Sequence, residues 1–208
     1  CALVILVVGI FAASSVFAIS APYMALYFND NAGNEFVYTS MSTPGQVTFN
    51  GAVGNWNVNV STLLSYPAYG TQAVPRMDLN SINKFAGGQG SLTIMACVIN
   101  FDPSPGAGFE VALGGTTAGT VKFAGYSSKS VDFFTLTNLL FESPLYSAGG
   151  SKSIAYSGEF SGAVPVGSTS YTLAAYITSP GPTSFDIDYK VPEPTSLMLL
   201  GLGLLALR

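Results

Sequence analysis

The segment Asn55-Trp56-Asn57-Val58-Asn59-Val60 alternates without a break between amide and large apolar side chains. Successive side chains of a β-strand point to opposite faces, so Trp56, Val58 and Val60 share one face and the asparagines share the other. A strand of this kind packs its apolar face on a core and turns its polar face to solvent, as antiparallel sheets commonly do. The segment therefore predicts antiparallel β-structure.

The same period of two recurs along most of the chain, between breaks rich in glycine and proline. Typical breaks are Thr43-Pro44-Gly45, Gly87-Gly88-Gln89-Gly90 and Ser179-Pro180-Gly181-Pro182, which carry the residues that turns prefer. The expected strands cover residues 23–28, 35–40, 46–50, 55–60, 92–99, 109–113, 120–124, 153–160, 171–178 and 185–190. Short strands at this spacing predict an all-β fold, an antiparallel β-sandwich of jelly-roll-like type.

Two stretches depart from simple alternation. Leu92 to Ile99 is apolar at both parities, which predicts a central strand covered on both sides. Cys97 lies in this segment and is the only cysteine between residues 19 and 190, so we expect a buried, inert thiol rather than a reactive one and no disulfide within the domain. The stretch from Val131 to Phe141 is ambiguous between helix and strand, and we expect a strand with one short helical turn nearby.

The carboxy-terminal segment combines three features: the motif Val191-Pro192-Glu193-Pro194, an apolar run from Leu197 to Leu207, and a basic end at Arg208. The prolines prevent a strand or helix from continuing through the motif and leave it extended. This tripartite tail resembles the PEP-CTERM sorting signal of exported proteins of Gram-negative bacteria. The resemblance implies processing by exosortase, a membrane-embedded cysteine peptidase.

The resemblance also implies transient insertion of residues 197–207 into the inner membrane as an apolar sorting helix. The alternative is a buried strand or helix of the domain core, but the run has neither strand nor helix periodicity. A helix over these residues would be only about 17 Å long, against about 30 Å of hydrocarbon. Either the natural tail continues beyond Arg208, which we expect, or the Arg208 side chain reaches the headgroups from a locally thinned bilayer. After processing, the protein is expected at the cell surface or outside the cell.

The amino-terminal residues are an apolar stretch followed by Val16-Phe17-Ala18. Small residues at Val16 and Ala18 satisfy the rule for signal peptidase, so we expect an incomplete signal peptide over residues 1–18, cleaved after Ala18. A transmembrane anchor is the alternative. The expected division is thus a signal peptide at 1–18, a sandwich domain at 19–190 and a sorting signal at 191–208.

Charge and composition exclude several classes of function. Seven lysines and arginines stand against eleven aspartates and glutamates, a formal net charge of −4, so we expect no nucleic-acid partner. The sequence contains no histidine, which removes Ser-His-Asp and Cys-His catalysis and histidine-bearing metal sites. No phosphate-binding or dinucleotide-binding glycine motif is present. We expect neither an enzyme nor a cofactor.

A pair of carboxylates still requires consideration. Asp186 and Asp188 share one face of the strand 185–190, about 7 Å apart, a spacing compatible with an inverting glycosidase. The competing interpretation is a solvated edge strand whose charges prevent strand-to-strand aggregation, with Phe185, Ile187 and Tyr189 facing the core. We favour the edge strand.

Ligand binding has two further candidates. Residues 29–35 gather oxygen-bearing side chains around a glycine, as calcium sites do, although an Asn/Asp/Gly hairpin explains the same residues and is the interpretation we favour. Tyr66, Tyr69 and Tyr126 could stack on sugar rings if exposed. The calcium ligands would be Asp30, Asn31, Asn34 and Glu35.

The sorting resemblance and the neutral, hydroxyl- and amide-rich composition together suggest two functions. The first is a structural or adhesive protein of the cell surface or extracellular matrix, associated with exopolysaccharide or biofilm. The alternative is a carbohydrate-binding module of the cell surface. Exosortase and signal peptidase would be the processing partners, and exopolysaccharide the ligand or neighbour.

Overall fold

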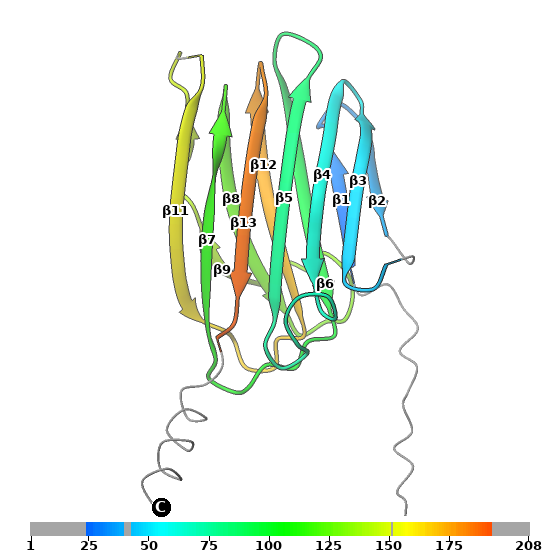
Figure 1. Ribbon diagram of the computed structural model, residues 1–208, viewed down its shortest axis with the longest axis vertical. Coiled ribbons are helices and arrows are strands. Elements are labelled where there is room, and N and C mark those ends of the chain that lie inside the picture. Colours follow the sequence, from blue (N-terminus) through cyan, green and yellow to red (C-terminus); the bar gives the residue numbers. More distant parts are fainter. Residues whose placement is uncertain (1–23, 40–42, 151, 193–208) are drawn as a thin grey trace, which may run out of the picture.

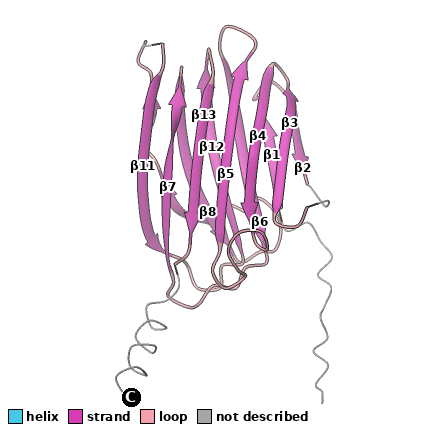
Figure 2. Ribbon diagram, in the orientation of Figure 1, coloured by secondary structure: helices cyan, strands magenta, loops and turns pink. Residues whose placement is uncertain are grey.

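The computed structural model of the chain describes residues 24–39, 43–150 and 152–192, and these form two antiparallel sheets that pack face to face (Figure 1). The described residues contain strands, turns and loops, and no α-helix (Figure 2). The predicted all-β antiparallel sandwich is therefore confirmed. The expected signal peptide at 1–18 and the apolar sorting helix at 197–207 lie outside the described residues.

The first sheet has the order β10-β8-β12-β6-β1-β2, with β9 also paired to β8. Its strands are β1 (Met24–Asn29), β2 (Glu35–Tyr38), β6 (Gly90–Ile99), β8 (Thr120–Ser128), β9 (Asn138–Glu142), β10 (Tyr146–Ser147) and β12 (Ser170–Ser179). The second sheet has the order β11-β7-β13-β5-β4-β3. Its strands are β3 (Gln46–Val53), β4 (Trp56–Ser65), β5 (Arg76–Phe85), β7 (Gly108–Thr117), β11 (Ile154–Ala163) and β13 (Thr183–Lys190). From β5 to β8 and from β11 to β13, consecutive strands alternate between the sheets.

Trp56 shows how the alternating segment produces this packing. Its side chain is 1% exposed, and its Nε1–H donates to the carbonyl oxygen of Ser91 in the opposite sheet at 2.9 Å. The Trp56 ring also packs on Phe85, with centroids 5.2 Å apart. Val58 and Val60 are buried beside it, as the period of two predicts. The hydrogen bond satisfies the polar atom of the largest core side chain, so burying Trp56 carries no polar penalty.

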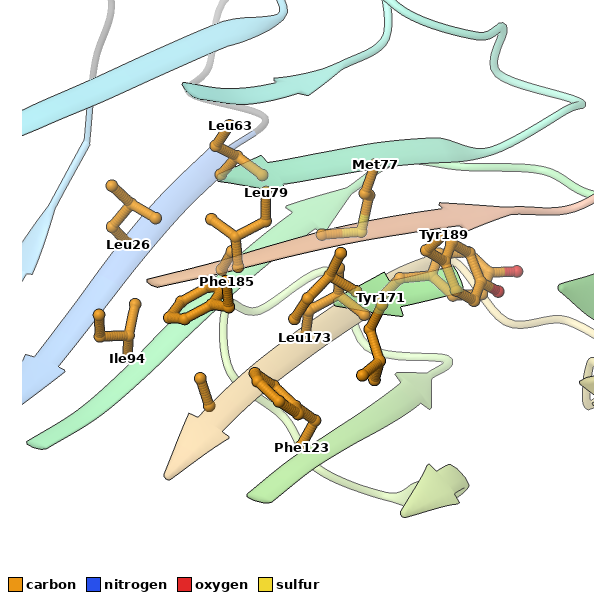
Figure 3. Close-up of a cluster of buried hydrophobic side chains, with 14 of the residues drawn as sticks. Leu26, Leu63, Met77, Leu79, Ile94, Phe123, Tyr171, Leu173, Phe185 and Tyr189 are labelled. Carbon is orange, nitrogen blue, oxygen red and sulfur yellow. The ribbon is translucent and has the colours of Figure 1, made fainter. Parts of the chain in front are cut away.

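The core fills the space between the two sheets (Figure 3). One wall consists of aliphatic and aromatic side chains of the first sheet, and the second sheet supplies the facing wall. Each such side chain contributes about 1.5–3 kcal/mol when fully buried. Labelled examples from the first sheet are Leu26, Ile94, Phe123, Tyr171 and Leu173, and from the second Leu63, Met77, Leu79, Phe185 and Tyr189.

The prediction of a strand covered on both faces over Leu92–Ile99 is confirmed only for the carboxy-terminal half of β6, because Thr93 and Met95 are half-buried. Cys97 is fully buried on the outer side, where the backbone N–H of Phe134 donates to its Sγ at 3.4 Å. The ring of Phe134 also packs on Tyr27, with centroids 5.8 Å apart. Burial raises the pKa of the Cys97 thiol, which keeps it protonated. The β8–β9 loop therefore acts as a cover for this part of the sheet.

The expectation for residues 131–141 was wrong in its first half. Only Asn138 onward forms a strand, β9, and the preceding residues form an irregular loop without a helical turn. Phe134 has a φ of 59° in this loop, a value that ends any regular element. Phe134 covers the outer face of the first sheet at β6, whereas Val131 and Leu136 of the same loop are exposed.

The strand β5 was missed by the sequence interpretation because its polarity pattern is inverted over its second half. Ser81 and Asn83 point inward and are buried, whereas Ile82 points outward and is 59% exposed. The two inward polar side chains bind each other, because the Ser81 hydroxyl donates a hydrogen bond to Asn83 Oδ1 at 3.0 Å. The buried polar pair Ser81 and Asn83 therefore disguises the strand period of β5, which lies between β4 and β13 in the sheet.

Candidate functional site

The sorting motif begins directly at the folded sandwich. Val191, its first residue, is 1% exposed and belongs to the hydrophobic core. The Val191 backbone N–H donates to the carbonyl oxygen of Pro75 at 2.8 Å, immediately after the end of β13. Pro192 is exposed, and Glu193 and Pro194 lie outside the described residues. The sequence interpretation assigned Val191 only to the tail, whereas its side chain completes the domain.

The last strand is held firmly on both sides. β13 pairs with β5 and with β7 over its whole length, and Lys190 lies opposite both Arg76 and Glu110. Tyr189 is buried and stacks on Phe109, with centroids 6.0 Å apart. The Lys190–Glu110 ion pair at 3.0 Å lies at the surface and contributes little. Pairing and burial therefore fix the point where the sorting motif leaves the sandwich.

The carboxylate pair lies on a different kind of strand from the one we expected. Asp186 and Asp188 do point to solvent from β13, with Phe185, Ile187 and Tyr189 in the core. However, β13 is an interior strand of its sheet, so the edge-strand interpretation was wrong. The order of strands depends on pairings distant in sequence, which a local pattern does not specify.

The structure adds a third carboxylate, Asp78 of β5, to this row. Its Oδ1 accepts a hydrogen bond from the side-chain amide of Asn80 at 2.6 Å, and the Tyr69 hydroxyl donates to Asp188 Oδ1 at 3.3 Å. Partial burial, followed by repulsion from the neighbouring carboxylates, raises the pKa of Asp78 and of Asp186. Asp78 was missed because β5 itself was missed.

Two hollows lie on either side of this acidic row, on the outer face of the second sheet. Small residues of β7, Ala112 and Gly114, contribute to their floors. The polar side chains that line them offer hydrogen-bond acceptors and donors to a hydroxyl-rich ligand. They are Glu110, Glu159, Ser161, Asp188 and Lys190 in one hollow, and Ser61, Asn80, Ser184 and Asp186 in the other.

The acidic loop forms the connection between β1 and β2, and its geometry is that of a hairpin. Asp30 Oδ1 accepts the backbone N–H groups of Ala32 and Asn34 at 2.9 and 3.0 Å, and Oδ2 accepts the Asn34 side-chain amide at 2.7 Å. Glu35 lies opposite Asn29 in the register and accepts its side-chain amide at 3.4 Å. Asn31 adopts a φ of 57°, as a tight turn requires. The Asp30 carboxylate is thus occupied by the loop itself.

The electrostatics of this loop agree with that geometry. Desolvation acts to raise the pKa of Asp30, but the hydrogen bonds from Asn34 and Ala32 outweigh it and lower the pKa below its ordinary value. Among the described residues, no group of three aspartate, glutamate, cysteine or histidine side chains is placed to hold a metal ion. The four residues proposed as calcium ligands are together, but as parts of one turn.

The three tyrosines do not form a common stacking platform. All three are half-buried. Tyr66 packs against the core, and Tyr69 lies beside Asp188 with the Arg76 guanidinium 5.4 Å from its ring centroid. Tyr126 lies on β8, in the other sheet. A single sugar chain therefore cannot stack on all of them at once.

The part of the chain that the structure describes contains no helix long and apolar enough to cross a bilayer. The region expected to enter the membrane, residues 197–207, falls outside that part.

Residues 190–208 match the PEP-CTERM protein-sorting motif, which confirms the resemblance drawn from the tail. This motif marks exported proteins that are sorted to the cell envelope by exosortase. No curated protein matches the chain.

Three solved structures are similar to the chain at low identity. The K1 cleaved adhesin domain of Lys-gingipain from Porphyromonas gingivalis W83 is 14% identical with a TM-score of 0.38, over 71% of this chain and 99% of that one. TmCBM61 in complex with β-1,4-galactotriose is 16% identical with a TM-score of 0.32, over 67% and 88%. The enzymatically active domain of tailspike protein 4 of bacteriophage CBA120 is 13% identical with a TM-score of 0.39. The match covers 68% of this chain but only 20% of the tailspike chain. Similarity at this level carries no conclusion about ligand or activity.

Proposed function

We propose that the chain is an exported protein of the cell surface or extracellular matrix, with a structural or adhesive role associated with exopolysaccharide or biofilm. Signal peptidase would remove residues 1–18 after Ala18, and exosortase would process the motif Val191–Pro194. The sandwich, of jelly-roll-like type, is the part delivered. The observation that carries the proposal is the direct continuity of a matched sorting motif with a last strand that is paired on both sides over its whole length.

The packing supports delivery of an intact domain. The core is closed by residues between Met24 and Val191, and Cys97 is the only cysteine of the described residues, buried and unpaired. Stability therefore rests on packing, without disulfides or the tail. Removal of the segment beyond Val191 leaves every core side chain of the described residues in place, so the domain can remain folded after the sorting signal is cut.

The proposal is tested by changing the sorting motif in a host that carries exosortase. Glu193→Ala, or deletion of residues 197–208, should alter release or surface display of the protein. Glu142→Ala is the matched control, because it removes a surface glutamate from β9, in the other sheet and outside both hollows. Circular dichroism should give the same β spectrum for all three proteins. Unchanged processing of Glu193→Ala and of the deletion would contradict the proposal.

The acidic row supports carbohydrate binding as a second candidate function. Carboxylates accept hydrogen bonds from sugar hydroxyls, and the hollows beside Asp186 and Asp188 lie open on the outer face of an interior strand. Calorimetric titration with exopolysaccharide from the producing strain tests this function. Saturable binding that is lost in the Asp186→Asn, Asp188→Asn double variant, and kept in Asp102→Asn, would establish it. Absence of saturable binding in the unaltered protein would leave the purely structural role.

A further inference from the structure

Both described termini of the domain lie at one end of the sandwich. β1 begins at Met24, opposite Val98 near the end of β6, and β13 ends at Lys190, opposite Arg76 at the start of β5. Because β5 and β6 are joined at the other end, the start of β5 and the end of β6 share this end, as Figure 1 shows at the bottom. We call it the exit end and define it by the connections 66–75, 100–107, 129–137 and 164–169.

The chain between the sandwich and the apolar run is short. The six steps from Val191 to Leu197 span at most about 22 Å when fully extended. β13 itself has eight residues and is about 27 Å long, so the opposite end of the sandwich is farther from Val191 than the tether can reach. Since pairing and burial fix Val191, the tether holds the exit end closest to any membrane that takes up residues 197–207.

The surface of the exit end is suited to a lipid interface. Val131 is 57% exposed and Val166 is 63% exposed. Lys129 is also exposed in the same connections, and the only other charged side chains there are Asp102 and Asp132. Asp102 and Asp132 outnumber Lys129, so the exposed apolar side chains rather than the net charge match a lipid interface. The stem of Lys129 can lie on the apolar layer while its ammonium reaches a phosphate.

We propose that the exit end lies against the lipid headgroups while residues 197–207 are inserted, with Val131 and Val166 in contact with the interface. This inference rests on the proposed sorting function, since it needs an inserted tail. It goes beyond that function by assigning an orientation and a contact surface to the folded domain. The exosortase substrate is then a motif presented between a folded domain and the bilayer surface, within a few residues of both.

Fluorescence quenching in vesicles tests the orientation. Residues 19–208, the form expected after removal of the signal peptide, are placed in phosphatidylethanolamine–phosphatidylglycerol vesicles that carry a nitroxide on the headgroup. A dye is attached to Val166→Cys, to Val131→Cys as a second position, or to Gly88→Cys as the control at the opposite end. A Cβ atom at position 88 would have no neighbouring atom within 4 Å, so Gly88→Cys fits without a clash. The native Cys97 is buried and is therefore not labelled by the dye.

We expect loss of fluorescence at positions 166 and 131 and none at position 88. Equal loss at both ends, no loss at 166 and 131, or failure of the chain to float with the vesicles would overturn the proposal. The assay contains no exosortase. If quenching in vesicles is as expected but the protein is not sorted in cells, only the proposed function is contradicted. If the protein is sorted in cells but the quenching pattern is wrong, only the proposed orientation is contradicted.

Discussion

Asp188 of β13 lies directly opposite Asp78 of β5, so two carboxylates face solvent side by side on interior strands of one sheet. Asp186, two residues before Asp188, joins them on the same face. Directly opposed like charges destabilise a strand pair. The sheet accepts this arrangement with the help of Tyr69, which donates to Asp188, and Asn80, which donates to Asp78.

The first prediction concerns Asp78. The unfolded carboxyl has a pKa near 3.8, and partial burial with repulsion raises the pKa of Asp78 in the folded state. The stability that its protonated form contributes is therefore present below pH 3.8 and lost as the pH rises through the folded pKa. Asp78→Asn should raise the free energy of unfolding at pH 7, by no more than about 1 kcal/mol because the group is largely solvent-screened.

Urea unfolding at pH 7 and pH 3 measures this effect. The gain at pH 7 should vanish at pH 3, where the wild-type carboxyl is also protonated. Asp102→Asn, in an exposed loop, is the control and should show no comparable gain. A loss of stability in Asp78→Asn at pH 7 would mean that its hydrogen bond with Asn80 outweighs the repulsion.

The second prediction concerns Val191. Its side chain is a core residue as well as part of the sorting motif, so Val191→Ala should lower the free energy of unfolding by about 2 kcal/mol. Val166→Ala, at an exposed position, should change it by less than about 0.5 kcal/mol. Urea unfolding of residues 19–192 compares the two. Equal stability of both variants would show that the domain ends before Val191.

The third prediction concerns the acidic hairpin. Calcium bound only to the native state at a hundredfold excess over its Kd would add about 2.7 kcal/mol, or several degrees in Tm. We expect no such rise between chelator and millimolar calcium, because the Asp30 oxygens are already hydrogen-bonded within the turn. A rise that disappears in the Asp30→Ala, Glu35→Ala double variant would make the loop a metal site.

The same carboxylate should matter at low pH. The pKa of Asp30 is lowered on folding, so its contribution is present above pH 3.8 and is lost as the pH falls through the folded pKa. Asp30→Ala should therefore destabilise the domain at pH 7, by about 1–2 kcal/mol for the orphaned N–H groups of the turn. Thermal unfolding at pH 7 and pH 3 would show a smaller difference between Asp30→Ala and wild type at the lower pH.

The fourth prediction concerns the turn that covers this hairpin. Gly54 has a φ of 55°, and a side chain there would overlap the Asp30 carboxylate. Gly54→Ala should therefore cost about 1–3 kcal/mol, whereas Gly88→Ala, which meets no neighbouring atom, should be close to neutral. Thermal melting of the two variants under one buffer condition makes the comparison. Equal melting temperatures would contradict the packing of Asp30 beneath the β3–β4 turn.

The sequence predicted the parts of the fold that depend on local pattern. The alternation around Trp56 identified a strand and its buried face, and the Val191–Pro194 segment identified the sorting motif. The pattern failed where a buried polar pair, Ser81 and Asn83, replaced apolar residues in β5. Because β5 was not predicted, Asp78 was not identified as part of the acidic row. Its position beside Asp188 depends on the pairing of β5 with β13, which are distant in sequence.

The mass of the protein exported from an exosortase-bearing host tests the central claim most directly. Intact mass spectrometry should find a chain that begins at Ile19 and ends between Val191 and Leu197, with the sandwich folded. The same gene in a host without exosortase should retain the residues from Leu197 onward. An exported chain that keeps Arg208 in both hosts would contradict the account of this protein as a sorted β-sandwich.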